Sequence, residues 1–171
     1  MERFAAFRHA NFRRYFAGQV ISSVGTWLQA LAVTWLVLDL TGRSDRLGIA
    51  VALQFLPLLL LGAPAGVLAD RVDNRRLLMM TSAVSAALAL VFGLVVTAGT
   101  EKLWVIYALT FVSGLVLAVE RPAMQALLFQ LVGRESLPSA VAANSTIASV
   151  SRLVGPALGG AMIAVSGVAS C

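Results

Sequence analysis

The sequence consists mainly of five long apolar runs separated by short polar segments. The runs cover residues 16–40, 47–69, 77–98, 103–132 and 139–168. Each reaches the roughly 20 residues that a helix rising about 1.5 Å per residue needs to cross about 30 Å of hydrocarbon. The backbone finds no water inside a bilayer, so each run must be helical, and strands of a transmembrane barrel would be shorter and alternating. We therefore predict an all-α membrane protein with about five transmembrane helices.

The composition agrees with a location in the bilayer. The chain is 59% hydrophobic and only 12% charged, whereas a soluble domain carries about 25% charged residues. One cysteine, Cys171, and one histidine, His9, provide neither a disulfide framework nor a multi-histidine metal site. The first run is longer than the apolar part of a signal peptide, so we expect it to be retained as a span. No cofactor or metal is expected.

The distribution of basic residues predicts the topology. With residues 1–15 in the cytoplasm, the inner segments hold eight basic residues and the outer loops hold three. The inner residues are Arg3, Arg8, Arg13, Arg14, Arg71, Arg75, Arg76 and Arg134, and the outer ones are Arg43, Arg46 and Lys102. This bias predicts a cytoplasmic N-terminus in the cell (inner) membrane and an extracytoplasmic end at residues 169–171. The net charge of +5 then reflects topology, and nucleic acid is not an expected partner.

The segment GVLADRVDNRR, residues 66–76, concentrates charge between the second and third runs. A topology anchor needs only positive charge, so Asp70 and Asp73 call for another explanation. Gly66 lies four residues before Asp70, on the same helix face, where a glycine permits close approach of another helix. Asp70 is then able to accept hydrogen bonds from a helix N-terminus or an arginine, in a contact that forms in one conformation and breaks in another. The alternatives are a gate and a plain anchor.

This segment resembles the loop signature of the major facilitator superfamily, G-x-x-x-D-R-x-G-R-R. The matching positions are Gly66, Asp70, Arg71 and Arg75. Asp73 replaces the usual glycine, and Asn74 replaces a basic residue. The D-R-x-D variant is similar to that of bacterial exporters in the enterobactin and macrolide efflux branch. The segment NFRRYFAGQVISSVG, residues 11–25, also resembles the entry to the first span in that branch.

A second motif, GPALGG at residues 155–160, resembles the end of the superfamily's antiporter signature, G-P-x-x-G-G. The matching positions are Gly155, Pro156, Gly159 and Gly160. Ala142 and Ser151 stand where the longer pattern has glycines, so the match is partial. Pro156 removes a helical hydrogen bond, and the glycines permit a tight helix crossing. Ordinary packing of small residues is the alternative interpretation.

Polar residues in the first run fall on one helical stripe, with spacings of three, four and three. Such side chains are penalised in lipid, so the stripe should face protein or a water-filled cavity. The resemblance implies that this span lines the substrate pathway, and helix–helix hydrogen bonding is the alternative. The candidate pathway residues are Gln19, Ser22, Thr26 and Gln29, with Asn144 in the fifth run. In the third run, one face of small residues predicts packing only: Ser82, Ser85, Ala89 and Gly93.

Charged residues within the last two runs predict a buried network of Glu120, Arg121 and Arg152. If these runs form an antiparallel hairpin about residue 136, Glu120 lies level with Arg152. Adjacent helical residues point about 100° apart, so Arg121 does not fully neutralise Glu120. A charge at this depth pairs or lines a polar cavity, and Glu120 is the candidate for proton coupling. The alternative is that Arg152 extends its side chain to water.

These features predict transmembrane transport. We expect the N-terminal part of a secondary active, proton-coupled exporter of small amphipathic or hydrophobic solutes that are drug-like or siderophore-like. The resemblance implies two six-helix halves, each a 3+3 inverted repeat, so the expected partners are the lipid bilayer, a small-molecule substrate, protons and a C-terminal half missing from a truncated chain. The alternative is a non-transporting fragment that associates with or regulates a full-length transporter. The sequence contains no phosphate-binding loop, and the runs contain no nucleophile–base pair. An enzyme is therefore not expected.

The predicted topology is testable by cysteine labelling of intact cells. We expect single cysteines within residues 1–15 and 70–76 to be protected from a membrane-impermeant maleimide, because both segments lie in the cytoplasm. A cysteine at position 102 should be labelled, and Cys171 is first replaced by serine. Labelling of the 70–76 segment from outside would contradict the topology.

Overall fold

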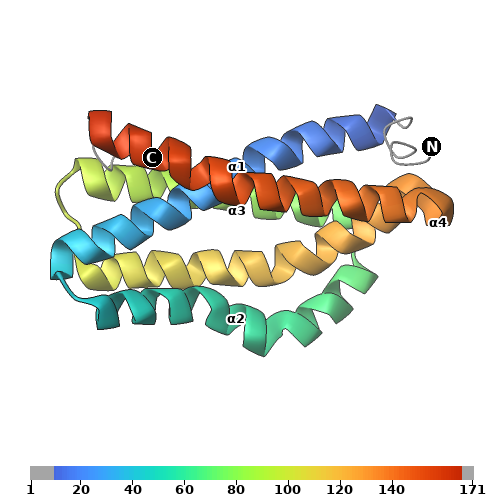
Figure 1. Ribbon diagram of the computed structural model, residues 1–171. Helices are drawn as coiled ribbons and strands as arrows, with labels where there is room; N and C mark the ends of the chain where they lie inside the picture. The colour runs from blue at the N-terminus through green and yellow to red at the C-terminus, as the bar shows by residue number, and fades with distance from the viewer. Residues whose placement is uncertain (1–9, 167–171) are drawn as a thin grey trace.

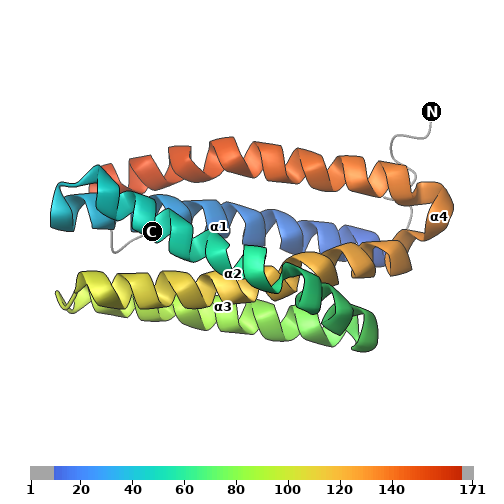
Figure 2. The same cartoon turned by 90° about the horizontal axis from the view of Figure 1, so that it is seen from below.

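The computed structural model of this chain describes residues 10–166, with all side chains in this range except those of residues 10–12, 14, 131–137 and 166. Its helices are α1 (Ala10–Thr41), α2 (Ser44–Arg71), α3 (Asn74–Thr97) and α4 (Leu103–Ser166). α4 turns back on itself, and its two limbs run in opposite directions (Figures 1 and 2). Within the described range, five helical segments are long and apolar enough to cross a membrane, which confirms the predicted fold class.

The boundaries differ most from the expected runs in two places. α1 is already helical at Ala10, the first described residue, whereas the expected run begins at residue 16. The polar segment at residues 133–138 was expected to be turn-like, but α4 is helical throughout it. Pro138 lies where the second limb of α4 begins and, lacking an N–H, removes one hydrogen bond at this change of direction. The expectations for residues 1–9 and 169–171 lie outside the described residues.

The turns between the helices follow from local chemistry. Gly42 and Gly99 adopt positive φ angles of 60° and 61°, directly or shortly after the ends of α1 and α3. This left-handed conformation costs other L-residues about 1–2 kcal/mol, and the N–H of Gly42 donates to the carbonyl of Leu38 at 2.7 Å. Asp73 caps α3, because its carboxylate accepts the N–H of Arg75 at 3.0 Å.

An apolar cluster closes one end of the bundle, where α1 and α3 end and α2 and α4 begin. The cluster consists of Leu36, Val37, Ala50, Phe92 and Ile106. The hydroxyl of Tyr107 also donates to the carbonyl of Arg46 at 2.9 Å, which ties the start of α4 to the start of α2. We call this the closed end. It lies opposite the end at which α1 begins (Figure 1).

Glycines set the close contacts of α4 with its neighbours. A Cβ atom added at Gly114 would collide with the backbone carbonyl of Gln54 in α2. A Cβ at Gly155 would lie 2.5 Å from the Cβ of Trp27 in α1, and one at Gly159 would lie 2.8 Å from Cδ2 of Leu31. The first limb therefore packs on α2 and the second limb on α1, both through small residues.

This packing predicts opposite effects of two alanine substitutions five residues apart. Gly155→Ala should lower the melting temperature of the purified full-length protein, because overpacking of this kind costs about 1–3 kcal/mol. Gly160→Ala is the matched control, since no atom lies within 4 Å of its added Cβ. It should leave the melting temperature unchanged or raise it, because alanine favours a helix over glycine by about 1 kcal/mol. Equal melting temperatures for the two variants would contradict the contact.

Candidate solute and ion pathway

The predicted polar stripe of α1 lies along a series of hollows in the bundle. A groove of about 560 Å³ separates α1 from α3 and is called here the α1–α3 groove. A wider hollow of about 780 Å³, the end cavity, lies near the start of α1 and α3. An inner cavity of about 70 Å³ lies among all four helices. Each of the four stripe residues lines at least one of these hollows: Gln19, Ser22, Thr26 and Gln29.

The opposite face of α1 packs against the second limb of α4. Gly155 approaches Val24, Trp27 and Leu28, and Gly159 approaches Leu28 and Leu31. Figure 2 shows α1 running between the two limbs of α4. α1 therefore presents polar residues to the hollows on one side and larger apolar residues to α4 on the other.

The small residues of α3 do more than pack. They were expected to form a packing face only, but Ser82, Ser85, Ala89 and Gly93 all line the α1–α3 groove. Ser85 also lines the inner cavity. Small side chains on this face leave room between α3 and α1, so the prediction of packing alone was wrong.

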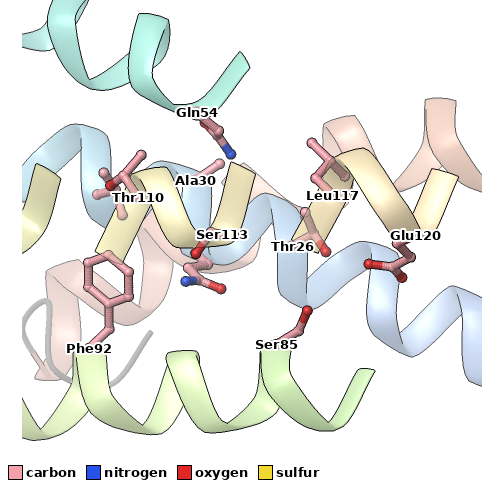
Figure 3. A pocket seen from close by; sticks show the side chains of 11 residues that line it. Thr26, Ala30, Gln54, Ser85, Phe92, Thr110, Ser113, Leu117 and Glu120 are labelled. Atoms are coloured by element: carbon pink, nitrogen blue, oxygen red, sulfur yellow. The ribbon is translucent and has the colours of Figure 1, made fainter. Parts of the chain in front are cut away.

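Glu120 lies where the inner cavity and the end cavity meet, because it lines both. In the inner cavity its carboxylate points toward the same space as the hydroxyls of Thr26 and Ser85 (Figure 3). In the end cavity it shares the lining with Tyr15 and Arg75. Among the residues that line these hollows in the described part of the chain, Glu120 is the sole carboxylate.

The predicted network of Glu120, Arg121 and Arg152 is not assembled. Arg152 stacks over the ring of Trp27, with its guanidinium carbon 5.0 Å from the ring centroid, and no ion pair joins it to Glu120 within the described residues. Arg121 is exposed. Glu120 lines hollows together with the polar stripe of α1, whereas Arg152 contacts Trp27, which lies against the second limb of α4. A cation–π contact therefore replaces the expected pairing with a carboxylate.

The residues of the loop motif have different surroundings. Asp73 is the N-cap of α3, and its carboxylate accepts a backbone N–H of the first turn. The glycine usual at this position of the motif has no side chain with which to accept it. Arg75 extends the motif into the lining of the end cavity. Asp70 and Arg71 are exposed, and within the described residues Asp70 forms no ion pair.

The expected close approach at Gly66 is not found. No atom lies within 4 Å of the position that its Cβ would take. The same holds for Gly160 in the antiporter-like motif, whose Gly155 and Gly159 do contact α1. Pro156 lies next to Gly155 and is half-buried. Within this chain only part of each motif supports helix packing.

Asn144 is half-buried in the second limb of α4 and lines none of the three hollows. The structure instead adds three polar residues that the sequence analysis did not select: Gln54, Thr110 and Ser113 line the inner cavity. Gln54 had a visible signal, since it is an amide in an apolar run. Thr110 and Ser113 had none, because isolated hydroxyl residues are common in membrane helices.

The chain matches a family model along its whole length and individual proteins along most of it. The family model described as transmembrane secretion effector matches residues 1–171. The staphyloferrin A transporter of Staphylococcus aureus is 33% identical over 154 residues, which cover 88% of this chain and 38% of that protein. Macrolide efflux protein A of Streptococcus pyogenes is 27% identical over 90% of this chain and 38% of its own length. The enterobactin exporter EntS of Citrobacter koseri is 27% identical over 94% and 39%.

The chain thus spans less than two-fifths of the length of these curated relatives. No solved structure matches it at comparable significance. The relatives are named as transporters and efflux proteins rather than enzymes. The family match and the five apolar helices of the described range identify a multi-pass membrane protein. The chain belongs to the transmembrane secretion effector family of the major facilitator superfamily.

Proposed function

We propose that this chain is the N-terminal part of a secondary active exporter of small amphipathic or hydrophobic solutes, located in the cell (inner) membrane with a cytoplasmic N-terminus. The observation that carries the proposal is the series of hollows along the polar face of α1. The relatives support the solute class, since their names refer to staphyloferrin A, macrolides and enterobactin. The remainder of a longer transporter is proposed to supply the facing wall.

The α1–α3 groove is the proposed solute site. Its volume of about 560 Å³ lies within the range of about 300–1,000 Å³ typical of small-molecule pockets. Apolar side chains such as Leu90 and Phe92 line it together with the polar groups of Ser22, Thr26 and Gln29. An apolar wall with a few polar groups suits a solute that has both kinds of surface.

Glu120 is the proposed site of proton coupling. It is half-buried and lines both the end cavity and the inner cavity. A carboxyl group at such a junction exchanges a proton with whichever hollow is hydrated, and its charge affects the solute beside it. Coupling then requires only that protonation and solute occupancy influence each other through this one group.

Proton-coupled export is testable in everted membrane vesicles that contain the full-length protein. A pH-sensitive dye reports proton movement after erythromycin or enterobactin is added to energised vesicles. We expect proton release with the unmodified protein, and its loss in Glu120→Gln, which keeps the shape of the side chain but cannot ionise. Glu101→Gln, in the loop before α4, is the control and should behave like the unmodified protein. Undiminished proton release in Glu120→Gln would reject this residue as the coupling site.

The loop motif is proposed to act as a gate through Asp70. Its carboxylate is exposed and forms no ion pair within the described residues, and Gly66 on the same helix face has open space above it. These two features leave room for a helix of the remaining transporter, whose N-terminus or arginine side chain would bind Asp70 in one conformation.

Two asparagine substitutions separate a gate from a structural turn. Asp70→Asn should reduce the export rate several-fold without lowering the amount of protein in the membrane, because it removes the charge of the proposed contact. Asp73→Asn is the matched control, since asparagine caps a helix about as well as aspartate. Normal export kinetics in Asp70→Asn would make the loop a plain anchor.

A further inference from the structure

We infer that Arg152, which lies over the ring of Trp27, binds a carboxylate group of an amphipathic solute at a second site, separate from the α1–α3 groove. Neither Arg152 nor Trp27 lines any of the three hollows. The inference rests on the proposed function only for the transport of the bound solute, since binding to this site is measured without transport.

The contact with Trp27 holds the charge of Arg152 at mid-span. Arg152 lies near the centre of the span Pro138–Val165, and Trp27 lies near the centre of the span Tyr15–Thr41. The guanidinium carbon is 5.0 Å from the ring centroid. The side chain is therefore directed at α1, rather than extended toward a helix end and water.

Trp27 compensates this charge only in part. An aromatic face attracts a cation but supplies no oxygen lone pair for the five N–H donors of a guanidinium. Within the described residues, the side chain of Arg152 forms no ion pair and no hydrogen bond. A charge at mid-span is costly unless it pairs or lines a polar cavity. The exposed guanidinium therefore requires an anionic partner from outside the described residues.

The helix faces around Arg152 are polar but carry no negative charge. Ser149 and Ser145 precede Arg152 by three and seven residues, on the same face of α4, and both are exposed. Ser23 lies one turn before Trp27 on α1 and is half-buried. Neither residues 138–165 of α4 nor residues 15–38 of α1 include an acidic residue. No carboxylate on these two segments therefore competes with a ligand for Arg152.

An amphipathic carboxylate fits this arrangement. The planar guanidinium matches a carboxylate with two parallel hydrogen bonds, and the half-buried ring of Trp27 offers an apolar surface beside it. The phosphate groups of lipids lie at the bilayer surface, about 15 Å from its centre, so they are remote from a residue at mid-span. An exchangeable ligand is favoured over a fixed acidic side chain, because Trp27 already holds the guanidinium in place without an anion that a solute would have to displace.

The site is testable by scintillation proximity binding of tritiated 1-naphthylacetate, an amphipathic carboxylate, to the purified full-length protein. Its neutral amide, 1-naphthylacetamide, is the matched ligand without charge. We expect the carboxylate to bind about tenfold more tightly than the amide, because only the carboxylate pairs with the guanidinium. Arg152→Gln should lower the affinity for the carboxylate to that for the amide and leave the affinity for the amide unchanged. Arg152→Lys keeps the charge without the planar fork and should weaken carboxylate binding several-fold, which provides a second variant should Arg152→Gln not fold.

Arg43→Gln is the control for loss of a positive charge. Arg43 is exposed and already donates to both carboxylate oxygens of Asp45 at 2.9 Å. Its substitution should leave both affinities unchanged.

Equal affinity of the unmodified protein for the carboxylate and the amide would overturn the inference, and this is the result expected if a fixed acidic side chain of a longer protein occupies Arg152. Carboxylate affinity that is unchanged in Arg152→Gln or Arg152→Lys would overturn it as well. Proton release after addition of erythromycin separates this inference from the proposed function. Proton release without a preference for the carboxylate rejects only the Arg152 site, and carboxylate binding without proton release rejects only the proposed function.

Discussion

The structure depends on one constraint: in lipid, every backbone N–H and C=O must find its partner within the protein. The chain satisfies it with helices, which hold their own backbone hydrogen bonds. Several hydroxyl residues obey the same constraint, since Thr34, Thr110 and Ser113 donate to carbonyls of their own helices. The backbone N–H and C=O groups are therefore already paired within the helices. What distinguishes one part of the bundle from another is the side chains that each helix face presents.

α1 has two faces with different surroundings. Its polar stripe lines the hollows, and its opposite face receives Gly155 and Gly159 of α4 at close range. The glycines make the contact tight on one side, while the small residues of α3 keep a groove open on the other. The α1–α3 groove extends to the last turn of α3, beside the apolar cluster, and the end cavity lies where α1 begins.

Glu120, which is half-buried, and Arg152, which is exposed, have different surroundings. Arg152 is accommodated by the ring of Trp27, because an aromatic face attracts a cation without adding a second charge. Glu120 lies among neutral oxygen-bearing side chains, and no opposite charge lines the inner cavity. This difference leaves Arg152 with a structural partner. It leaves Glu120 with no opposite charge in the inner cavity, which is why the proposed coupling depends on this residue.

The sequence by itself determined the helical class, the number of spans in the described range, and the polar stripe of α1. These follow from run length and from spacing along one helix, which are local properties. The hairpin estimate predicted that Glu120 lies level with Arg152. Only the tertiary structure decided that they have different surroundings, that α3 lines a groove, and that Gln54 and Thr110 reach the inner cavity. The physical reason is that contacts between helices depend on the rotation of each helix about its axis, which packing with all its neighbours sets together.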